Sequence, residues 1–177
     1  RQFIAGLLAH AEEIAAITNQ HVNSYKRLWG GGEAPSYVCW GHLNRSALVR
    51  VPLYKPKKAA AARIEYRAPD PSANPYLAFS ACLMAGIDGI KRRIEPAAPI
   101  DKDLYELPPA EYQDIAKLPS SLEAALDALR EDHEFLTEGD VFTQDLIDTW
   151  LDYKETNEVA PMRAYPHPYE YQMYYDL

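Results

Sequence analysis

The sequence predicts an α+β fold in which antiparallel strands carry several arginines and helices lie behind them. Apolar residues recur at helical spacing in the first 19 residues and again through the second half of the chain. Between residues 37 and 68, short runs of β-branched and aromatic residues alternate with turn-forming segments, which is typical of strands. With 177 residues, 47% hydrophobic and 25% charged, the chain is long enough to bury one core, and its composition argues against disorder.

Four helices are expected. The first covers residues 1–19 and ends near Asn19. The second begins at Pro75, where a missing backbone N–H costs least, has Asn74 as its cap, and runs to about Arg93. A capping-box pattern at Ser120 and Glu123 starts the third. The apolar residues that mark the third and fourth helices are Leu122, Leu126, Leu129, Leu146, Ile147, Trp150 and Leu151.

Strands are expected at 37–40, 47–52 and 63–68, and we expect them to pair in one sheet. The preceding segment, 23–36, contains three successive glycines and a proline and is expected to be a loop. Residues 96–109 are rich in proline and acidic residues and are expected to lie on the surface.

The first residue is Arg1, and helical periodicity begins at once without a cap, so we expect a fragment of a longer protein. No apolar run approaches the roughly 20 residues needed to cross a bilayer, and no secretory signal opens the chain. Cys39 and Cys82 match neither a disulfide framework nor a zinc spacing, which favours a reducing compartment. A cytoplasmic location without membrane contact is therefore expected.

The charge is divided between the two parts of the chain. Residues 1–68 carry ten Lys and Arg against four Asp and Glu, a balance of +6, whereas residues 69–177 carry eight against twenty-two, a balance of −14. This division favours an anionic ligand in the first part. Nucleic acid is disfavoured as a partner, because the basic residues are not interleaved with aromatic residues on which bases would stack.

The final segment, residues 161–177, carries five tyrosines, which is unusual for a chain end. Aromatic side chains at this density are expected to be buried against something. Packing against the chain's own domain and docking on another subunit both remain open from the sequence.

The stretch Arg63-Ile64-Glu65-Tyr66-Arg67 is the most informative for chemistry. Side chains alternate across a strand, so Arg63, Glu65 and Arg67 are expected on one face, while Ile64, Tyr66 and Ala68 pack on the other. The exposed face fits a plain ion network. It also fits a site in which Glu65 binds Mg²⁺ or Mn²⁺ and the arginines grip phosphate or carboxylate oxygens.

Other polar residues lie nearby in sequence. Arg50 is on the second expected strand, and Arg45 is expected in the turn before it; together with Arg63 and Arg67 they suggest convergence on polyanionic oxygens. Glu33 follows the glycines and is either an exposed loop residue or a lid carboxylate. The five histidines show no ligand spacing, so each is expected to have a packing or surface role.

Seven motifs, taken in their order along the chain, resemble the carboxy-terminal part of bacterial type I glutamine synthetase. The motifs are NSYKRL at 23–28, GGEAP at 31–35, NRSALVRVP at 44–52, RIEYRAPDPSANPYL at 63–77, LMAGIDGIK at 83–91, DKDLYELPP at 101–109 and PHPYEYQMYYDL at 166–177. The resemblance covers essentially residues 1–177, which would form the carboxy-terminal part of the family's catalytic domain. It places the family's N-terminal β-grasp domain outside this chain.

The resemblance implies ATP-dependent joining of ammonia to glutamate through a γ-glutamyl phosphate, with two Mg²⁺ or Mn²⁺ ions in each active site. Arg27 and Arg67 would contact glutamate, and Glu33 would close the site and deprotonate ammonium. The remaining implied roles are nucleotide binding for Arg45, Arg50, Lys58 and Arg63, a catalytic contribution from Arg45 to charge stabilisation, and metal binding for Glu65.

The resemblance also implies that Tyr105 matches a tyrosine adenylylated by a partner adenylyltransferase in some members, and that residues 161–177 join subunits in a dodecamer of two hexameric rings. Most metal carboxylates belong to family segments outside this chain, so the isolated chain is expected to be inactive. The stretches WGGGEAPS and VCWGH also suit a γ-glutamyl ligase for a polyamine or another amine. A third reading is an inactive truncated paralogue that acts as an assembly subunit.

Overall fold

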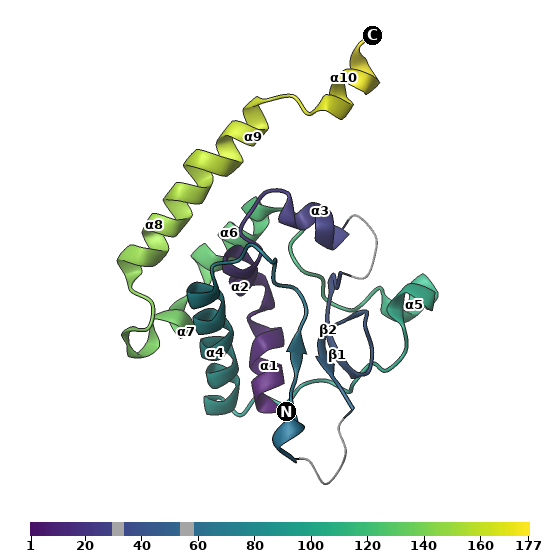
Figure 1. Cartoon of the computed structure of the whole chain (residues 1–177), viewed down its shortest axis with the longest axis vertical. Helices are drawn as coiled ribbons and strands as arrows, with labels where there is room; N and C mark the ends of the chain where they lie inside the picture. The colour runs from purple at the N-terminus through teal and green to yellow at the C-terminus, as the bar shows by residue number, and fades with distance from the viewer. Residues whose placement is uncertain (30–33, 54–58) are drawn as a thin grey trace.

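The computed structural model describes residues 1–29, 34–53 and 59–177. It confirms the α+β class: helices pack beside one small sheet, and a long helical arm leads from this body to the C-terminus (Figure 1). In order, the elements are α1 (Gln2–Ala9), α2 (Ala11–Thr18), α3 (Ser24–Trp29), β1 (Tyr37–His42), β2 (Ala47–Val51), a 3₁₀ turn (Ala59–Ala61), β3 (Glu65–Tyr66), α4 (Pro75–Lys91), a 3₁₀ turn (Leu104–Glu106), α5 (Pro109–Tyr112), α6 (Leu122–Glu131), α7 (Glu134–Thr137), a 3₁₀ turn (Glu138–Asp140), α8 (Gln144–Lys154), a π-helical turn (Glu155–Val159), α9 (Ala160–Ala164) and α10 (Pro168–Tyr174).

The first expected helix is interrupted at His10. Its φ of −108° and ψ of 22° end α1 and begin α2, so residues 1–19 form two short helices. Asn19 terminates α2 as expected. Each helix buries most of one side, and Ile14, at 0% exposed, lies in the main hydrophobic core.

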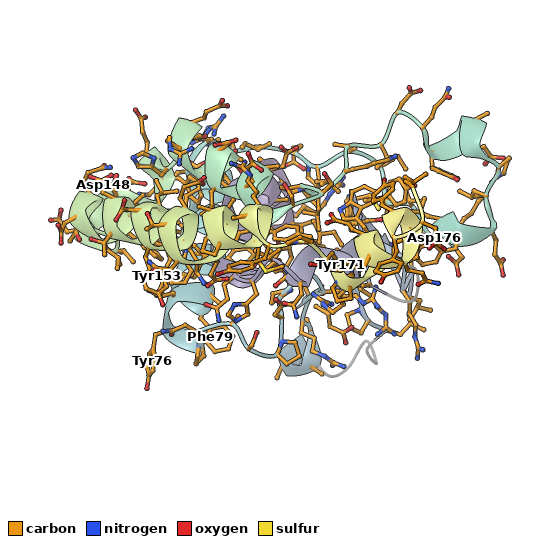
Figure 2. All side chains as sticks on the ribbon, turned by 90° about the horizontal axis from the view of Figure 1, so that it is seen from above. Tyr76, Phe79, Asp148, Tyr153, Tyr171 and Asp176 are labelled. Carbon is orange, nitrogen blue, oxygen red and sulfur yellow. The ribbon has the colours of Figure 1, made fainter. Side chains whose placement is uncertain are left out.

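Helix α4 packs along α1, and the two lie side by side in Figure 1. The side chain of Asn74 accepts hydrogen bonds from the backbone N–H groups of Tyr76 and Leu77, which confirms the predicted cap before Pro75. The opposite side of α4 is uncovered in this chain. Tyr76 and Phe79 point outward from it (Figure 2).

The sheet has the order β1-β2-β3, and the prediction of antiparallel pairing is right for one pair only. β2 and β3 are antiparallel, with Arg50 opposite Glu65, whereas β1 and β2 are parallel. Residues 43–46 connect these two strands, and Leu43 in this connection has a φ of 60°. Asn44 holds this connection, because its side-chain nitrogen donates to the carbonyls of Ile100 (2.7 Å) and Lys102 (2.8 Å). The expected third strand, 63–68, is hydrogen-bonded as a strand only at 65–66.

Two further local predictions need correction. Residues 24–29, expected in a loop, form α3. The third helix is capped by Ser121, whose hydroxyl accepts from the N–H of Ala124 at 3.1 Å, and not by Ser120. The predicted apolar face of this helix is right, since Leu122, Leu126 and Leu129 are all buried.

The end of the chain projects from the body. α8, the π-helical turn and α9 run as one rod, and α10 lies at its far end (Figure 1). The tyrosines of residues 161–177 are exposed, so the alternative in which they pack against their own domain is wrong for this structure. No helix in the described ranges is both long and apolar enough to cross a membrane.

Candidate functional site

The ion pair between Arg50 and Glu65 is the centre of the candidate site. The two residues are direct neighbours across the β2–β3 pair, and Nη1 of Arg50 donates to Oε2 of Glu65 at 2.8 Å. Both side chains are partly buried, at 22% and 34% exposed, so the pair is less screened by water than an ion pair on an open surface. The sheet therefore presents a carboxylate and a guanidinium together on one face.

The opposite face of this strand is packed into the core. Ile64 and Tyr66 contact the main hydrophobic cluster, and Ala68 is fully buried, which confirms the predicted alternation on this side. Burial raises the pKa of the Tyr66 phenol well above its ordinary value. The backbone that carries Glu65 is thus anchored by apolar side chains on either side of it.

Arg67 and Arg27 both make contacts near the end of β3. The guanidinium of Arg67 donates to the carbonyl of Ala47 at 3.4 Å. Arg27, on α3, donates to the carbonyl of Ala68, the residue that follows Arg67, and its Nε donates to Asp70 at 3.1 Å. The two arginines that the resemblance assigns to one substrate are therefore each fixed by a backbone carbonyl of the sheet region.

Two further arginines that the sequence analysis singles out, Arg45 and Arg63, lie close to the sheet strands in sequence. Arg45 is exposed in the connection before β2, as expected. Arg63 is exposed and lines an open pocket of about 630 Å³, together with Trp40, His42 and Val51. This pocket combines an aromatic wall with a cationic rim, which suits a ligand that has both a flat ring and anionic groups.

Two predicted site residues, Glu33 and Lys58, lie outside the described residues. Tyr105 is described: it lies in a 3₁₀ turn, is half exposed, and its hydroxyl donates to the carbonyl of Ala34 at 2.8 Å. Through this hydrogen bond, the expected surface segment 96–109 contacts Ala34, the residue that follows Glu33 in the sequence.

Sequence reasoning missed Asp70. This carboxylate is nearly buried, accepts from the hydroxyl of Ser24 and from Arg27, and so ties α3 to the segment after β3. Asp70 follows Pro69 in what the sequence presents as an ordinary turn. The one feature of the sequence that could have indicated this role was the position of an acidic residue close to Arg67.

The described residues supply only part of a metal centre on the sheet. Glu65 offers one carboxylate with oxygen ligands of the kind that Mg²⁺ and Mn²⁺ prefer. Among the described residues, the single group of three nearby ligand atoms is His10, Glu13 and Asp132, which lies among the helices. Glu65 therefore fits a divalent ion as one ligand, with the other donors outside the described set.

Comparison with known proteins gives a consistent result along the whole chain. Residues 1–174 match the family model described as the glutamine synthetase catalytic domain. The chain is 58% identical to a glutamine synthetase of Streptomyces viridochromogenes and 57% identical to one of Mycolicibacterium smegmatis, in both cases over all of this chain. It spans only 38% and 37% of the length of these relatives.

Solved structures agree with the sequence comparison. A Plasmodium falciparum glutamine synthetase superposes with a TM-score of 0.85 at 26% identity, over 98% of this chain and 40% of that one. A structure of GmaS in complex with ADP superposes with a TM-score of 0.82 at 32% identity, over 99% of this chain and 39% of that one. The chain belongs to the glutamine synthetase family, and residues 1–174 correspond to part of its catalytic domain.

Proposed function

We propose that this chain is the carboxy-terminal part of the catalytic domain of an enzyme that joins ammonia to glutamate at the expense of ATP. The reaction would pass through γ-glutamyl phosphate, from which ammonia displaces phosphate. The Arg50–Glu65 pair carries the proposal, because it places a potential metal ligand and a phosphate-binding group side by side in a chain of this family.

Each described residue has a role that its position supports. Arg27 and Arg67 would bind and orient glutamate, and Arg50 and Arg63 would hold the nucleotide phosphates. Arg45, exposed before β2, would bind phosphate and stabilise the charge of the transferring group. Glu65 would bind one of two Mg²⁺ or Mn²⁺ ions, which supply charge neutralisation during phosphoryl transfer.

Three roles rest on the resemblance alone. Glu33 would close the site and take a proton from ammonium, and Lys58 would approach the nucleotide. Tyr105 would accept an adenylyl group from a partner adenylyltransferase. A cytoplasmic dodecamer of two hexameric rings would be the working assembly.

The test is phosphate release by the complete protein with ATP, Mg²⁺ and glutamate, with and without ammonium. Glu65→Gln keeps the size of the side chain but removes its charge, and we expect a loss of about 100-fold in turnover. Glu131→Gln, an exposed change on α6, is the matched control and should leave turnover unchanged. Full activity of Glu65→Gln would refute the proposed metal role.

A second candidate is a γ-glutamyl ligase for a larger amine. It is favoured by two aromatic side chains, Trp29 and Tyr37, whose rings lie 5.8 and 5.5 Å from the ammonium of Lys117. Such rings tolerate alkylated ammonium groups. Turnover with methylamine or a polyamine but not with ammonium would establish this function. Absence of turnover with any acceptor would favour the third alternative, an inactive paralogue that acts as an assembly subunit.

A further inference from the structure

His10 is a buried histidine whose ring is held in place by Phe135 and by a contact between one ring nitrogen and Asp88. It is 3% exposed, its ring stacks on Phe135 with centroids 3.8 Å apart, and its Nε2 lies 2.7 Å from Oδ2 of Asp88 on α4. The same oxygen of Asp88 accepts from Nη1 of Arg92 at 3.1 Å, as a carboxylate does. A carboxylate can only accept, so Nε2 of His10 carries the proton that joins them.

The other ring nitrogen of His10 is in an unusual environment. Nδ1 is buried and makes no hydrogen bond within the described part of the chain, and the same is true of Oε2 of Glu13. Nδ1 lies 3.9 Å from Oδ2 of Asp132, too far for a hydrogen bond. One ligand atom from each of His10, Glu13 and Asp132 lies within 4.8 Å of the others, so the imidazole is aimed at two carboxylates.

Three acceptors that face one another require a positive charge between them. A nitrogen lone pair and two carboxylates repel when they are left together in a partly buried site. A proton or a metal ion would resolve the repulsion.

The donor set favours a metal ion over a second proton. One imidazole and two carboxylates match the mixed nitrogen and oxygen ligands of Zn²⁺, with water in the fourth position. Metal-binding histidines usually donate their second N–H to a carboxylate, and Asp88 occupies this place. The side chain of Asp132 is 50% exposed, which gives an ion a route into the site.

We propose that His10, Glu13 and Asp132 bind a first-row divalent cation of the Zn²⁺ class, with Asp88 as the residue that positions His10. The ion would join the break between α1 and α2 to the end of α6, and through Asp88 to α4. The site is separate from the ion proposed at Glu65, and its role is structural.

The experiment is a calorimetric titration of the chelator-treated complete protein with ZnCl₂, together with thermal unfolding at each metal concentration. The unsubstituted protein and the variants of the proposed site are titrated side by side, so that zinc taken up at the proposed active-site metal positions is common to all of them and cancels in the comparison. We expect one Zn²⁺ per chain that the site variants bind more weakly, and a melting temperature that rises with metal. Asp132→Asn should raise the Kd at least about tenfold, and Asp88→Asn about 10–100-fold.

Glu12→Gln is the matched control, because Glu12 is the exposed neighbour of Glu13 on the same helix, and its Kd should be unchanged. Anomalous diffraction at the zinc edge should place the ion about 2.1 Å from Nδ1 of His10. Equal affinity in Asp132→Asn and Glu12→Gln, or crystals whose zinc lies away from His10, would overturn the proposal. Failure of the ligase proposal would leave this measurement unaffected.

Discussion

Asp70 shows how a single carboxylate can hold a candidate substrate-binding arginine in place. It accepts from Arg27 and from the hydroxyl of Ser24, and its side chain is only 8% exposed. Hydrogen bonds to charged groups are worth about 1.5–3 kcal/mol, and their loss leaves the remaining partners unpaired. We therefore expect Asp70→Ala to lower the free energy of unfolding by about 2 kcal/mol, as measured by urea denaturation.

The control for this prediction is Asp114→Ala, which removes an exposed carboxylate and should change the free energy of unfolding by less than about 0.5 kcal/mol. Equal stability of the two variants would show that Arg27 and Ser24 find other partners. In the complete enzyme, Asp70→Ala should also weaken glutamate binding, because Arg27 loses the contact that orients it.

The two buried thiols should make the free energy of unfolding depend on pH in the alkaline range. Burial raises the pKa of both Cys39 and Cys82 from about 9 to about 11. Between these values the unfolded chain loses thiol protons that the folded chain keeps, so stability is complete below pH 9 and falls as the pH rises. Each thiol should contribute a slope of about 1.4 kcal/mol per pH unit.

Urea denaturation at pH 8 and pH 9.5 measures this loss, and Cys82→Ala should remove about half of it. An identical loss in Cys82→Ala would mean that groups other than the thiols cause it. Burial also raises the pKa values of Tyr25 and Tyr66, and these phenols add their own loss once the pH passes about 10, the ordinary pKa of an unfolded tyrosine.

The site illustrates what residue patterns can and cannot predict. Alternation along 63–68 predicted that Ile64, Tyr66 and Ala68 face the core, because this follows from strand geometry alone. It did not identify Arg50 as the partner of Glu65. That contact depends on the register between two strands, which no local pattern specifies.

At the scale of elements, the backbones of α1 and α4 approach each other closely at Gly89. A Cβ atom added at Gly89 would overlap the carbonyl oxygen of Gln2 and the backbone of Gly6. Alanine is usually favoured over glycine in a helix by about 1 kcal/mol, but overpacking against backbone costs about 1–3 kcal/mol. Because backbone atoms cannot move aside as a side chain does, we expect Gly89→Ala to destabilise the protein by about 2 kcal/mol.

Thermal or urea unfolding tests this expectation, with Leu83→Ala on the exposed side of α4 as the control. That variant should change stability by less than about 0.5 kcal/mol. Stabilisation by Gly89→Ala would show that α1 and α4 can separate at little cost.

The errors in the predicted elements have tertiary causes. His10 breaks the first helix while it forms contacts with Asp88 and Phe135, two residues far away in sequence. The parallel pairing of β1 and β2 depends on a connection that Asn44 fastens to the distant segment 100–102. Caps at Asn74 and Asn19 were predictable because they depend on neighbours only.

At the scale of the whole molecule, the C-terminal arm carries aromatic side chains that the described residues leave exposed. Tyr171, Tyr174 and Tyr175 are 59%, 59% and 82% exposed, and Figure 1 shows α10, which contains Tyr171 and Tyr174, away from the body. Exposed aromatic side chains at this density mark an interface rather than a free surface. The structure therefore favours docking of residues 161–177 on another subunit, the alternative left open by the sequence.

Replacing these three tyrosines with serine should reduce the mass of the assembled complete protein, measured by light scattering at micromolar concentration. The fold of each subunit should survive, since the changes lie outside the core, and unchanged circular dichroism would confirm this. Tyr153→Ser, which changes an exposed tyrosine on α8 outside residues 161–177, is the matched control and should leave the assembly intact. An unchanged mass in the triple variant would assign subunit contact to another surface, with the outward side of α4 at Tyr76 and Phe79 as the next to test.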